Sequence, residues 1–311
     1  KRNIRFFKII FMKKNENILI IKHGALGDLI QADGIIKSIR YEHKNAKLVL
    51  LTSKKFISLM AMCPYIDDQL IDNRPSFFNI FSLINLYKKI KKNNFKIIYD
   101  LQNSQRTYIY RKYLFNKIKW ISTNREDDAI SGLRGLERML KENLVSNKNV
   151  LKPDVKWLSV NVKNLIKKNK ILSKYILLLP GSSKENPLKR WPYFCDLEKI
   201  LILNGYEVVT ILGPDELEME QTFSGHILKN LSWPLLAGII KKSEFIIGND
   251  SGPSHVASCL NKKGLALFGS STSATRSELK RGKFEILKVD NLENLTADEV
   301  LKETIKILNK K

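Results

Sequence analysis

The sequence lacks any long apolar run: no stretch of its 311 residues approaches the ~20 consecutive apolar residues that a membrane-spanning helix needs. Its three cysteines, Cys63, Cys195 and Cys259, lie far apart without C-x-x-C spacing, so we expect free, reduced thiols. These two absences favour a cytoplasmic chain. The length corresponds to about two average domains.

The first twelve residues, KRNIRFFKIIFM, are basic and apolar but lack the small-residue cleavage site of a secretory signal. Three interpretations stay open. The segment could be an interfacial amphipathic patch, a disordered tail, or an extension ahead of a native start at Met12.

Acidic residues are scarce: 31 Asp and Glu stand against 54 Lys and Arg, which gives a net charge of +23. Such a charge attracts nucleic acid, anionic lipid or a phosphorylated substrate. A lysine-rich, merely solvated surface explains it equally well, because many lysines fall on polar helix faces, as in residues 86–94. No helix-turn-helix, zinc-finger or RNA-binding signature accompanies the charge, so no nucleic-acid partner is predicted.

Several catalytic signatures are also missing. The chain has no G-x-G-x-x-G with an acidic residue at dinucleotide spacing, no Walker A loop and no G-x-S-x-G elbow. These absences disfavour an NAD enzyme, a P-loop NTPase and a serine hydrolase. Its four histidines show no H-x-x-x-H spacing, and no D-x-D pair follows a strand, so neither a metal site nor a cofactor is predicted.

Short apolar, β-branched runs alternate with helical patterns, which is typical of parallel sheets with crossover helices. Strands are predicted at 18–22, 48–52 and 96–100, and again at 175–179, 207–212, 245–248, 264–268 and 284–289. Helices are predicted at 29–40, 83–91, 192–204, 233–242, 254–260 and 297–308. The pattern restarts after a polar stretch at 151–174. We therefore predict an α/β protein with two doubly wound, Rossmann-like domains, residues 1–160 and 161–311, facing across a cleft, with the last helix free to pack back towards the first domain.

Three loops at predicted strand ends carry the candidate chemistry. In the first, Gly24 and Gly27 let backbone amides approach a ligand, and Asp28 stands at a helix N-terminus. Asp28 either complements the helix dipole or acts as a general base on an acceptor hydroxyl.

The second loop, residues 180–192, supplies a glycine, the hydroxyls of Ser182 and Ser183, and Lys189, a set of donors that suits a diphosphate. The third runs from 246 to 255 and opens a helix whose free amides would bind an anion. Its His255 is suited either to a phosphate or to a structural role in the turn. The carboxylates of Asp215 and Glu216, in a turn after another strand, suit ribose hydroxyls or simple turn chemistry.

Six motifs in order resemble those of glycosyltransferase family 9, the ADP-heptose:lipopolysaccharide heptosyltransferases. They are KHGALGD (22–28), YDLQ (99–102), KRWP (189–192), LGPDE (212–216), NDSGPSH (249–255) and ALFGSS (266–271). The resemblance runs from about Asn17 to the C-terminus and implies the two-domain GT-B fold.

The resemblance also implies roles. Asp28 would be the catalytic base of an inverting, metal-independent transfer, and Lys189 would bind the donor phosphates. The remaining donor-binding residues would be Gly24, Gly27, Ser182, Ser183, Asp215, Glu216, Asp250, Ser251, Gly252 and His255. The acceptor side would use Asp100, Gln102 and Arg106.

The implied reaction moves heptose from ADP-L-glycero-D-manno-heptose to an anionic, lipid-linked saccharide of the lipopolysaccharide core. The implied location is the cytoplasmic face of the inner membrane, with peripheral association. Two departures concern the sequence itself: His23 stands where the family usually has proline, and Ser270-Ser271 replaces Pro-Thr. The alternatives are a transferase using another nucleotide sugar, such as a UDP-sugar, for surface polysaccharide, or a non-catalytic protein that binds nucleotide sugar or anionic membrane.

Overall fold

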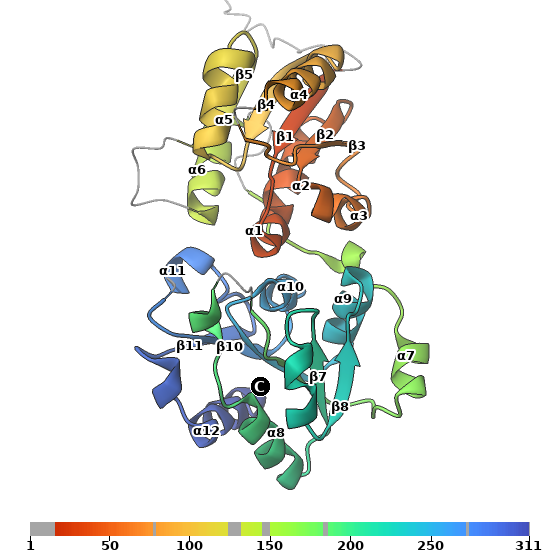
Figure 1. The fold of residues 1–311 in the computed structure, drawn as a ribbon, viewed down its shortest axis with the longest axis vertical. Coiled ribbons are helices and arrows are strands. Elements are labelled where there is room, and N and C mark those ends of the chain that lie inside the picture. Colours follow the sequence, from red (N-terminus) through yellow and green to blue (C-terminus); the bar gives the residue numbers. More distant parts are fainter. Residues whose placement is uncertain are drawn as a thin grey trace, which may run out of the picture.

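The computed structural model describes residues 16–76, 79–123, 132–144, 150–182, 186–271 and 274–310. These form two α/β lobes stacked along the long axis of the molecule, with the N-terminal lobe at the top of Figure 1 and the C-terminal lobe below it. Within the described parts, none of the helices is long and apolar enough to cross a bilayer. The three cysteines are free, as predicted.

The N-terminal lobe is built on a five-stranded parallel sheet of order β3-β2-β1-β4-β5. Its strands are β1 (Asn17–Ile21), β2 (Lys47–Thr52), β3 (Asp68–Ile71), β4 (Phe95–Asp100) and β5 (Lys119–Ser122). Its helices are α1 (Leu26–Gln31), α2 (Asp33–Glu42), α3 (Ile57–Met60), α4 (Ile80–Lys92), α5 (Gln105–Ile109), which continues into a π-helical turn, η2 (Tyr110–Leu114), and α6 (Leu133–Asn143). The central strands β1 and β2 are buried on both faces, which is why they are almost wholly apolar.

The C-terminal lobe holds a six-stranded parallel sheet of order β11-β10-β9-β6-β7-β8. Its strands are β6 (Ile176–Leu179), β7 (Val208–Leu212), β8 (His226–Lys229), β9 (Phe245–Asn249), β10 (Gly264–Phe268) and β11 (Phe284–Lys288). Its helices are α7 (Lys163–Lys168), α8 (Phe194–Leu203), α9 (Trp233–Lys242), α10 (Gly252–Cys259), α11 (Ala274–Ser277) and α12 (Ala297–Leu308). Short 3-10 turns are η1 (Lys54–Phe56), η4 (Lys156–Leu158), η5 (Pro187–Lys189), η6 (Leu217–Thr222) and η7 (Leu292–Asn294). The strand order reverses between β6 and β9, and between β1 and β4 in the other lobe; open α/β sheets bind ligands at the carboxyl ends of strands at such a reversal.

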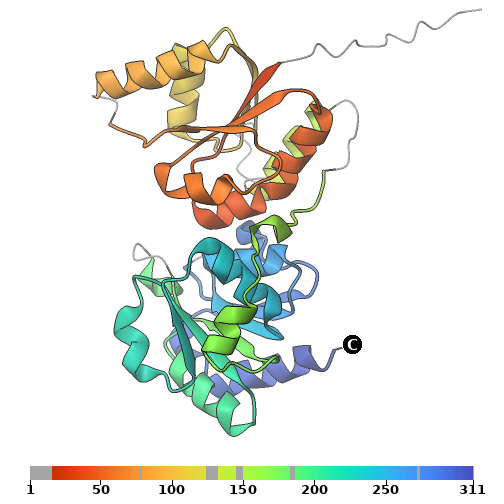
Figure 2. The same cartoon turned by 90° about the vertical axis from the view of Figure 1, so that its right-hand side faces the viewer.

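The predicted α/β class with two doubly wound sheets is confirmed, and the predicted strands match β1, β2, β4, β6, β7, β9, β10 and β11 to within a residue or two. The structure adds β3, β5 and β8, which all lie at sheet edges and carry partly exposed residues, so they lack a continuous apolar run. The helix predicted at 29–40 is two helices, α1 and α2, separated at Ala32. The final helix, α12, packs against α8 and β10 and stays within the C-terminal lobe, away from the first lobe (Figure 2).

The chain crosses from one lobe to the other through residues 151–162. On the N-terminal side, the carboxylate of Asp33 in α2 accepts hydrogen bonds from the amide of Asp154 and the indole of Trp157, both at 2.8 Å. On the C-terminal side, the amide of Val160 donates to the carbonyl of Pro234. The crossing segment packs against helix α9 at Gly238, where a Cβ atom would lie 2.5 Å from the Val160 carbonyl oxygen. A glycine is therefore required at this position by the close approach of the backbone.

Replacing Gly238 by alanine tests this contact. We expect the free energy of unfolding to fall by about 1–3 kcal/mol from overpacking, although alanine is intrinsically ~1 kcal/mol more favourable in a helix. Urea unfolding followed by far-UV circular dichroism measures the change. Lys242→Ala, at an exposed position of the same helix, serves as the control and should change stability little. A Gly238→Ala variant as stable as the parent would show that the crossing segment shifts freely.

Candidate active site

Helices α1 and α10 bring the two lobes together through two glycines. A Cβ atom at Gly27 would lie 2.5 Å from the imidazole Cδ2 of His255, and one at Gly252 would lie 2.5 Å from a methyl carbon of Leu26. Each glycine thus makes room for a side chain of the other lobe. The contact sets the N-terminal turns of both helices side by side at the mouth of a shared cleft.

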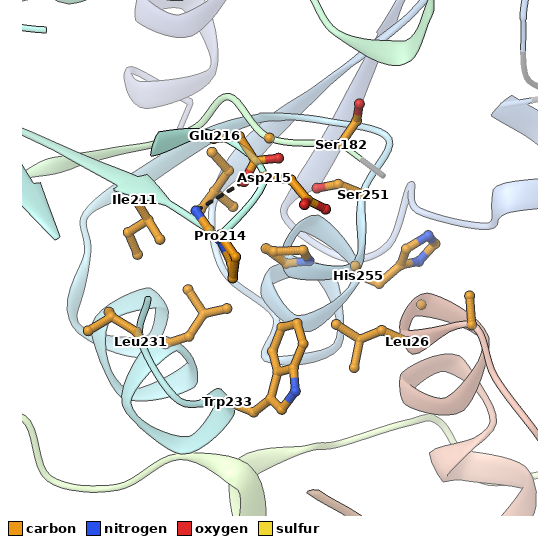
Figure 3. A pocket seen from close by; sticks show the side chains of 18 of the residues that line it. Leu26, Ser182, Ile211, Pro214, Asp215, Glu216, Leu231, Trp233, Ser251 and His255 are labelled. Carbon is orange, nitrogen blue, oxygen red and sulfur yellow. Dashed lines mark hydrogen bonds between the residues drawn. The ribbon is translucent and has the colours of Figure 1, made fainter. Parts of the chain in front are cut away.

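The cleft has a volume of about 1490 Å³ and is lined by both lobes. Its C-terminal wall has an apolar part, in which Ile211, Pro214, Leu231 and Trp233 lie together (Figure 3). Polar groups from the loops after β6, β7 and β9 line the rest of that wall. The predicted site residues gathered here are Gly27, Asp28, Ser182, Lys189, Asp215, Glu216, Asp250, Ser251, Gly252 and His255. Ser183 lies outside the described residues.

Asp28 occupies the first turn of α1 and lines the cleft from the N-terminal lobe. Its side chain is 53% exposed to solvent. One carboxylate oxygen accepts a hydrogen bond from the amide of Ala25, at 3.1 Å, and lies 3.9 Å from the ammonium of Lys22. The carboxylate therefore caps its own helix while remaining accessible. The structure thus accommodates both interpretations of Asp28, the helix-dipole partner and the base.

Lys189, Asp250 and His255 form a charged cluster on the opposite wall. The Lys189 ammonium lies 2.7 Å from one oxygen of Asp250, and His255 Nε2 lies 3.7 Å from the other. Burial opposes the ionisation of Asp250, but interactions with His255 and Lys189 outweigh it and lower its pKa to about 2. His255 Nδ1 is buried without a hydrogen-bond partner among the described residues. The cluster lies at the N-terminus of α10, whose free amides favour an anion.

Glu216 has a structural position beneath the loops. Its carboxylate accepts from the amide of Gly213 at 3.0 Å and pairs with Arg190 at 3.1 Å. A Cβ atom at Gly181 or Gly213 would lie 2.7 Å from this carboxylate, so the two turns close tightly around it. Burial raises the pKa of Glu216, and the charge of Arg190 works against that rise. Asp215, beside it, also lines the cleft.

Three features of the site were not singled out from the sequence: Asn249, Lys55 and the apolar wall. Asn249 is fully buried at the end of β9; its amide nitrogen donates to the Pro180 carbonyl at 2.7 Å, and its oxygen accepts from the Trp191 amide at 3.0 Å. It therefore ties the second loop to the third. Lys55 adds a cation to the N-terminal wall. The position of Asn249 at a strand end was a usable signal. Half of the apolar wall, Leu231 and Trp233, follows the unpredicted strand β8 and gave none.

Four predicted residues do not line the cleft: Gly24, Asp100, Gln102 and Arg106. Gly24 has a φ of 128°, and a Cβ atom there would meet the ring of Phe56 at 2.4 Å, which accounts for the glycine by packing. Asp100 is buried and accepts from the amides of Gln102 and Asn103, and burial raises its pKa.

Gln102 and Arg106 instead support the loop that carries Asp28. The side-chain oxygen of Gln102 accepts from the amide of His23 at 2.9 Å. The His23 imidazole lies 2.9 Å from the buried carboxylate of Asp72, which also accepts from the Tyr110 hydroxyl at 2.8 Å. Arg106 donates to that hydroxyl and to the Pro75 carbonyl. His23, which stands where proline is usual, thus ties its loop into a buried polar network.

An exposed carboxylate on one wall of a cleft and a paired ammonium at an anion-binding helix N-terminus on the other can serve a transfer reaction. The carboxylate is suited to accept a proton, and the opposite cluster is suited to stabilise a phosphorylated leaving group. Within the described parts of the chain, no group of three His, Cys, Asp or Glu side chains is placed to hold a metal ion. A cleft with these two walls is typical of a two-lobe transferase.

Comparison with known proteins identifies the family of transferases to which this chain is similar. The pattern of glycosyltransferase family 9 (heptosyltransferase) matches residues 138–296. Lipopolysaccharide heptosyltransferase 1 of Campylobacter coli is 24% identical, over 93% of this chain and 95% of that protein. A family 9 glycosyl transferase from Veillonella parvula DSM 2008 superposes with a TM-score of 0.78 at 16% identity, covering 94% of this chain and 97% of that one. The E. coli heptosyltransferase WaaC, solved with ADP-2-deoxy-2-fluoro heptose, gives a TM-score of 0.71 at 15% identity and covers 93% and 99%.

The chain belongs to glycosyltransferase family 9. Its fold is GT-B, two Rossmann-like domains facing across a cleft, and it is a glycosyltransferase of the heptosyltransferase family.

The Lys189–Asp250 pair should leave a signature in the pH dependence of stability. Because the folded pKa of Asp250 lies below its unfolded value, its contribution of about 2 kcal/mol is complete above the unfolded pKa and declines as pH falls towards about 2. We expect Lys189→Met to lower the free energy of unfolding at pH 6, with a deficit that shrinks by about half at pH 3.

Urea unfolding at pH 6, 5, 4 and 3 measures this difference. Lys229→Met serves as the control, because Lys229 pairs with Glu220 at 2.6 Å on the exposed surface and should contribute little at any pH. A Lys189→Met deficit that is constant from pH 6 to pH 3 would rule out Asp250 as the titrating partner.

Proposed function

We propose that this chain transfers L-glycero-D-manno-heptose from ADP-heptose to a saccharide of the lipopolysaccharide core, with inversion and without a metal ion. The observation that carries the proposal is a single cleft that joins the exposed Asp28 carboxylate on one lobe to the Lys189–Asp250–His255 cluster on the other. The relatives named above support the donor, since one of them was solved with an ADP-heptose analogue.

In the proposed step, Asp28 takes the proton of an acceptor hydroxyl as the hydroxyl oxygen attacks the anomeric carbon of the donor. The bond from that carbon to the ADP oxygen breaks, and ADP leaves with the negative charge. Base and leaving-group site stand on opposite walls of the cleft, so attack opposite the leaving group, with inversion, follows naturally.

The departing diphosphate carries charge that the C-terminal wall is suited to stabilise. Lys189 offers a cation held in place by Asp250, and the first turn of α10 offers backbone amides. His255 lines the cleft beside them, and its imidazole is suited to a donor oxygen. These groups would do the work that a divalent cation does in metal-dependent transferases.

The nucleotide would lie along the apolar wall formed by Ile211, Pro214, Leu231 and Trp233 (Figure 3). A flat base buries its faces well against such side chains. Asp215 and Glu216, the two carboxylates proposed for the ribose, both line the cleft.

The acceptor would enter from the N-terminal wall, beside Asp28. An anionic acceptor fits the excess of basic residues, and Lys55 lies on this wall within the cleft. Gln102 and Arg106 would assist by positioning the loop of Asp28, since Gln102 accepts a hydrogen bond from the amide of His23 and Arg106 donates to Tyr110 and Pro75. We further propose peripheral association with the cytoplasmic face of the inner membrane, where a lipid-linked acceptor would lie.

Asp28→Asn tests the base. We expect kcat to fall by about 10²–10⁴-fold with ADP-heptose and a purified core acceptor, because the amide cannot accept the proton. Turnover is measured as ADP release.

Asp196→Asn is the matched control, since Asp196 occupies the same third position of its helix, α8, and is 57% exposed, but lies outside the cleft. It should leave turnover unchanged. An Asp28→Asn enzyme within about tenfold of the parent would remove Asp28 from the chemistry.

A thermal-shift panel tests the donor base. Ligands that bind only the folded state raise the melting temperature, by several degrees at about 100-fold excess over Kd. We expect the order ADP above UDP and GDP, and a smaller ADP shift for Lys189→Met. Stronger stabilisation by UDP than by ADP would overturn the heptose proposal in favour of a UDP-sugar donor, and no shift with any nucleotide would argue against a donor site here.

A further inference from the structure

The outer face of α4 exposes large apolar side chains to solvent. Phe81 is 84% exposed, Ile80 62% and Ile84 43%, whereas the opposite face of the same helix buries Leu86 and Ile90 in the lobe's core. Single exposed apolar residues are ordinary, but three within two turns of one helix form a patch that is costly to leave in water.

The same face of α4 turns from apolar to basic along the helix. Phe81, Ile84, Lys88 and Lys92 follow one another at spacings of three and four residues and therefore share one stripe. Lys88 and Lys92 stand four residues apart with like charge, an arrangement that disfavours an isolated helix. An anionic surface beside the stripe would relieve that repulsion.

The wider segment around α4 is almost free of negative charge. From residue 79 to residue 123 the chain carries ten Lys or Arg and a single carboxylate, Asp100, which is buried. The π-helical turn η2 adjoins α4 through the stacking of Tyr87 on Phe115. In this turn the side chain of Tyr113 is 66% exposed. A lysine, Lys112, lies 5.2 Å from the Tyr113 ring. Tyrosine and lysine are residues that favour the interface between lipid and water.

We propose that the α4 stripe (Phe81, Ile84, Lys88 and Lys92) docks the enzyme on an anionic lipid bilayer. The apolar turns would enter the headgroup boundary while the lysines contact lipid phosphates. The inference rests on, and locates, the membrane association proposed above. A second copy of the chain fits this face poorly, because parallel pairing would set the stripe lysines against each other and antiparallel pairing would set them against the apolar side chains of Phe81 and Ile84.

The position of α4 suits this role. In both views it lies at the end of the N-terminal lobe that is remote from the C-terminal lobe (Figures 1 and 2). A membrane bound there leaves the C-terminal lobe, with its nucleotide wall, in solution. The lobe that carries Asp28 and the acceptor side is the one held at the lipid.

Flotation with vesicles tests the proposal, using the full chain and vesicles of phosphatidylcholine either alone or with one third phosphatidylglycerol. We expect binding to the anionic vesicles only, weakened at least about tenfold by Phe81→Ser/Ile84→Ser. Lys88→Gln/Lys92→Gln should weaken it by on the order of fivefold for each charge removed.

Matched controls lie on the C-terminal lobe. Leu203→Ser removes an equally exposed apolar residue of α8, and Lys163→Gln/Lys167→Gln removes two exposed lysines four apart in α7. Both should bind vesicles as the parent does. Equal losses in controls and stripe variants would overturn the proposal, since the net charge alone would then explain binding. Unchanged vesicle binding of the stripe variants would also overturn the proposal. The same holds if Lys88→Gln/Lys92→Gln weakens retention of the protein on a DNA duplex but leaves vesicle binding unchanged.

Heptose transfer to a delipidated, water-soluble acceptor separates this inference from the proposed activity. Phe81→Ser/Ile84→Ser should transfer to that acceptor at the parental rate while losing vesicle binding. If even the parent transfers no heptose, the proposed activity fails, and the vesicle result still decides the docking surface. A stripe variant that loses soluble transfer together with vesicle binding would contradict a role confined to docking.

Discussion

The close approach of α1 and α10 is the contact on which the active site depends. Gly27 makes room for His255 and Gly252 makes room for Leu26, so the two helices meet at their first turns. Asp28 follows Gly27 directly, and Asp250 precedes Gly252 by two residues. A side chain at either glycine would separate the two helices and, with them, the Asp28 carboxylate from the Lys189–Asp250–His255 cluster, which lie on different lobes.

Around that contact, charges are held by pairing rather than left free. Asp250 holds Lys189, Arg190 holds Glu216, and Asn249 joins the loops that carry them. Paired charges in a partly buried wall are oriented before a ligand arrives, so little reorganisation remains to be made during reaction. The N-terminal wall is different: Asp28 caps its own helix and remains half exposed. One wall thus carries paired, oriented charges, which suits the proposed nucleotide, and the other leaves its carboxylate accessible, which suits the proposed saccharide acceptor.

The sequence predicted the interior of both sheets because buried parallel strands are continuous apolar runs, as in β1 and β9. It missed β3, β5 and β8, whose exposed edge positions break that pattern. Among the candidate site residues, it named Asp28, Lys189 and Asp250, which line one cleft in the structure. It could not show that Lys189 and Asp250 pair across 61 residues, nor that the imidazole of His255 packs on Gly27, because both depend on how loops and lobes close. Asp100 looked like a ligand for an acceptor, and only the structure shows its carboxylate engaged by the turn that follows it.

The crossing segment has a consequence for synthesis on the ribosome. Asp33 and Ser38 in α2 are emerging from the exit tunnel while their partners, the amides of Asp154 and Leu151, are still more than a hundred residues away. Chains grow at about 5–20 residues per second. For several seconds, therefore, the carboxylate of Asp33 depends on water for its hydrogen bonds, and the lobe can complete its core only once Val155 and Leu158 have been added. The first half of this enzyme is a lobe whose last structural piece is made just before the second half begins.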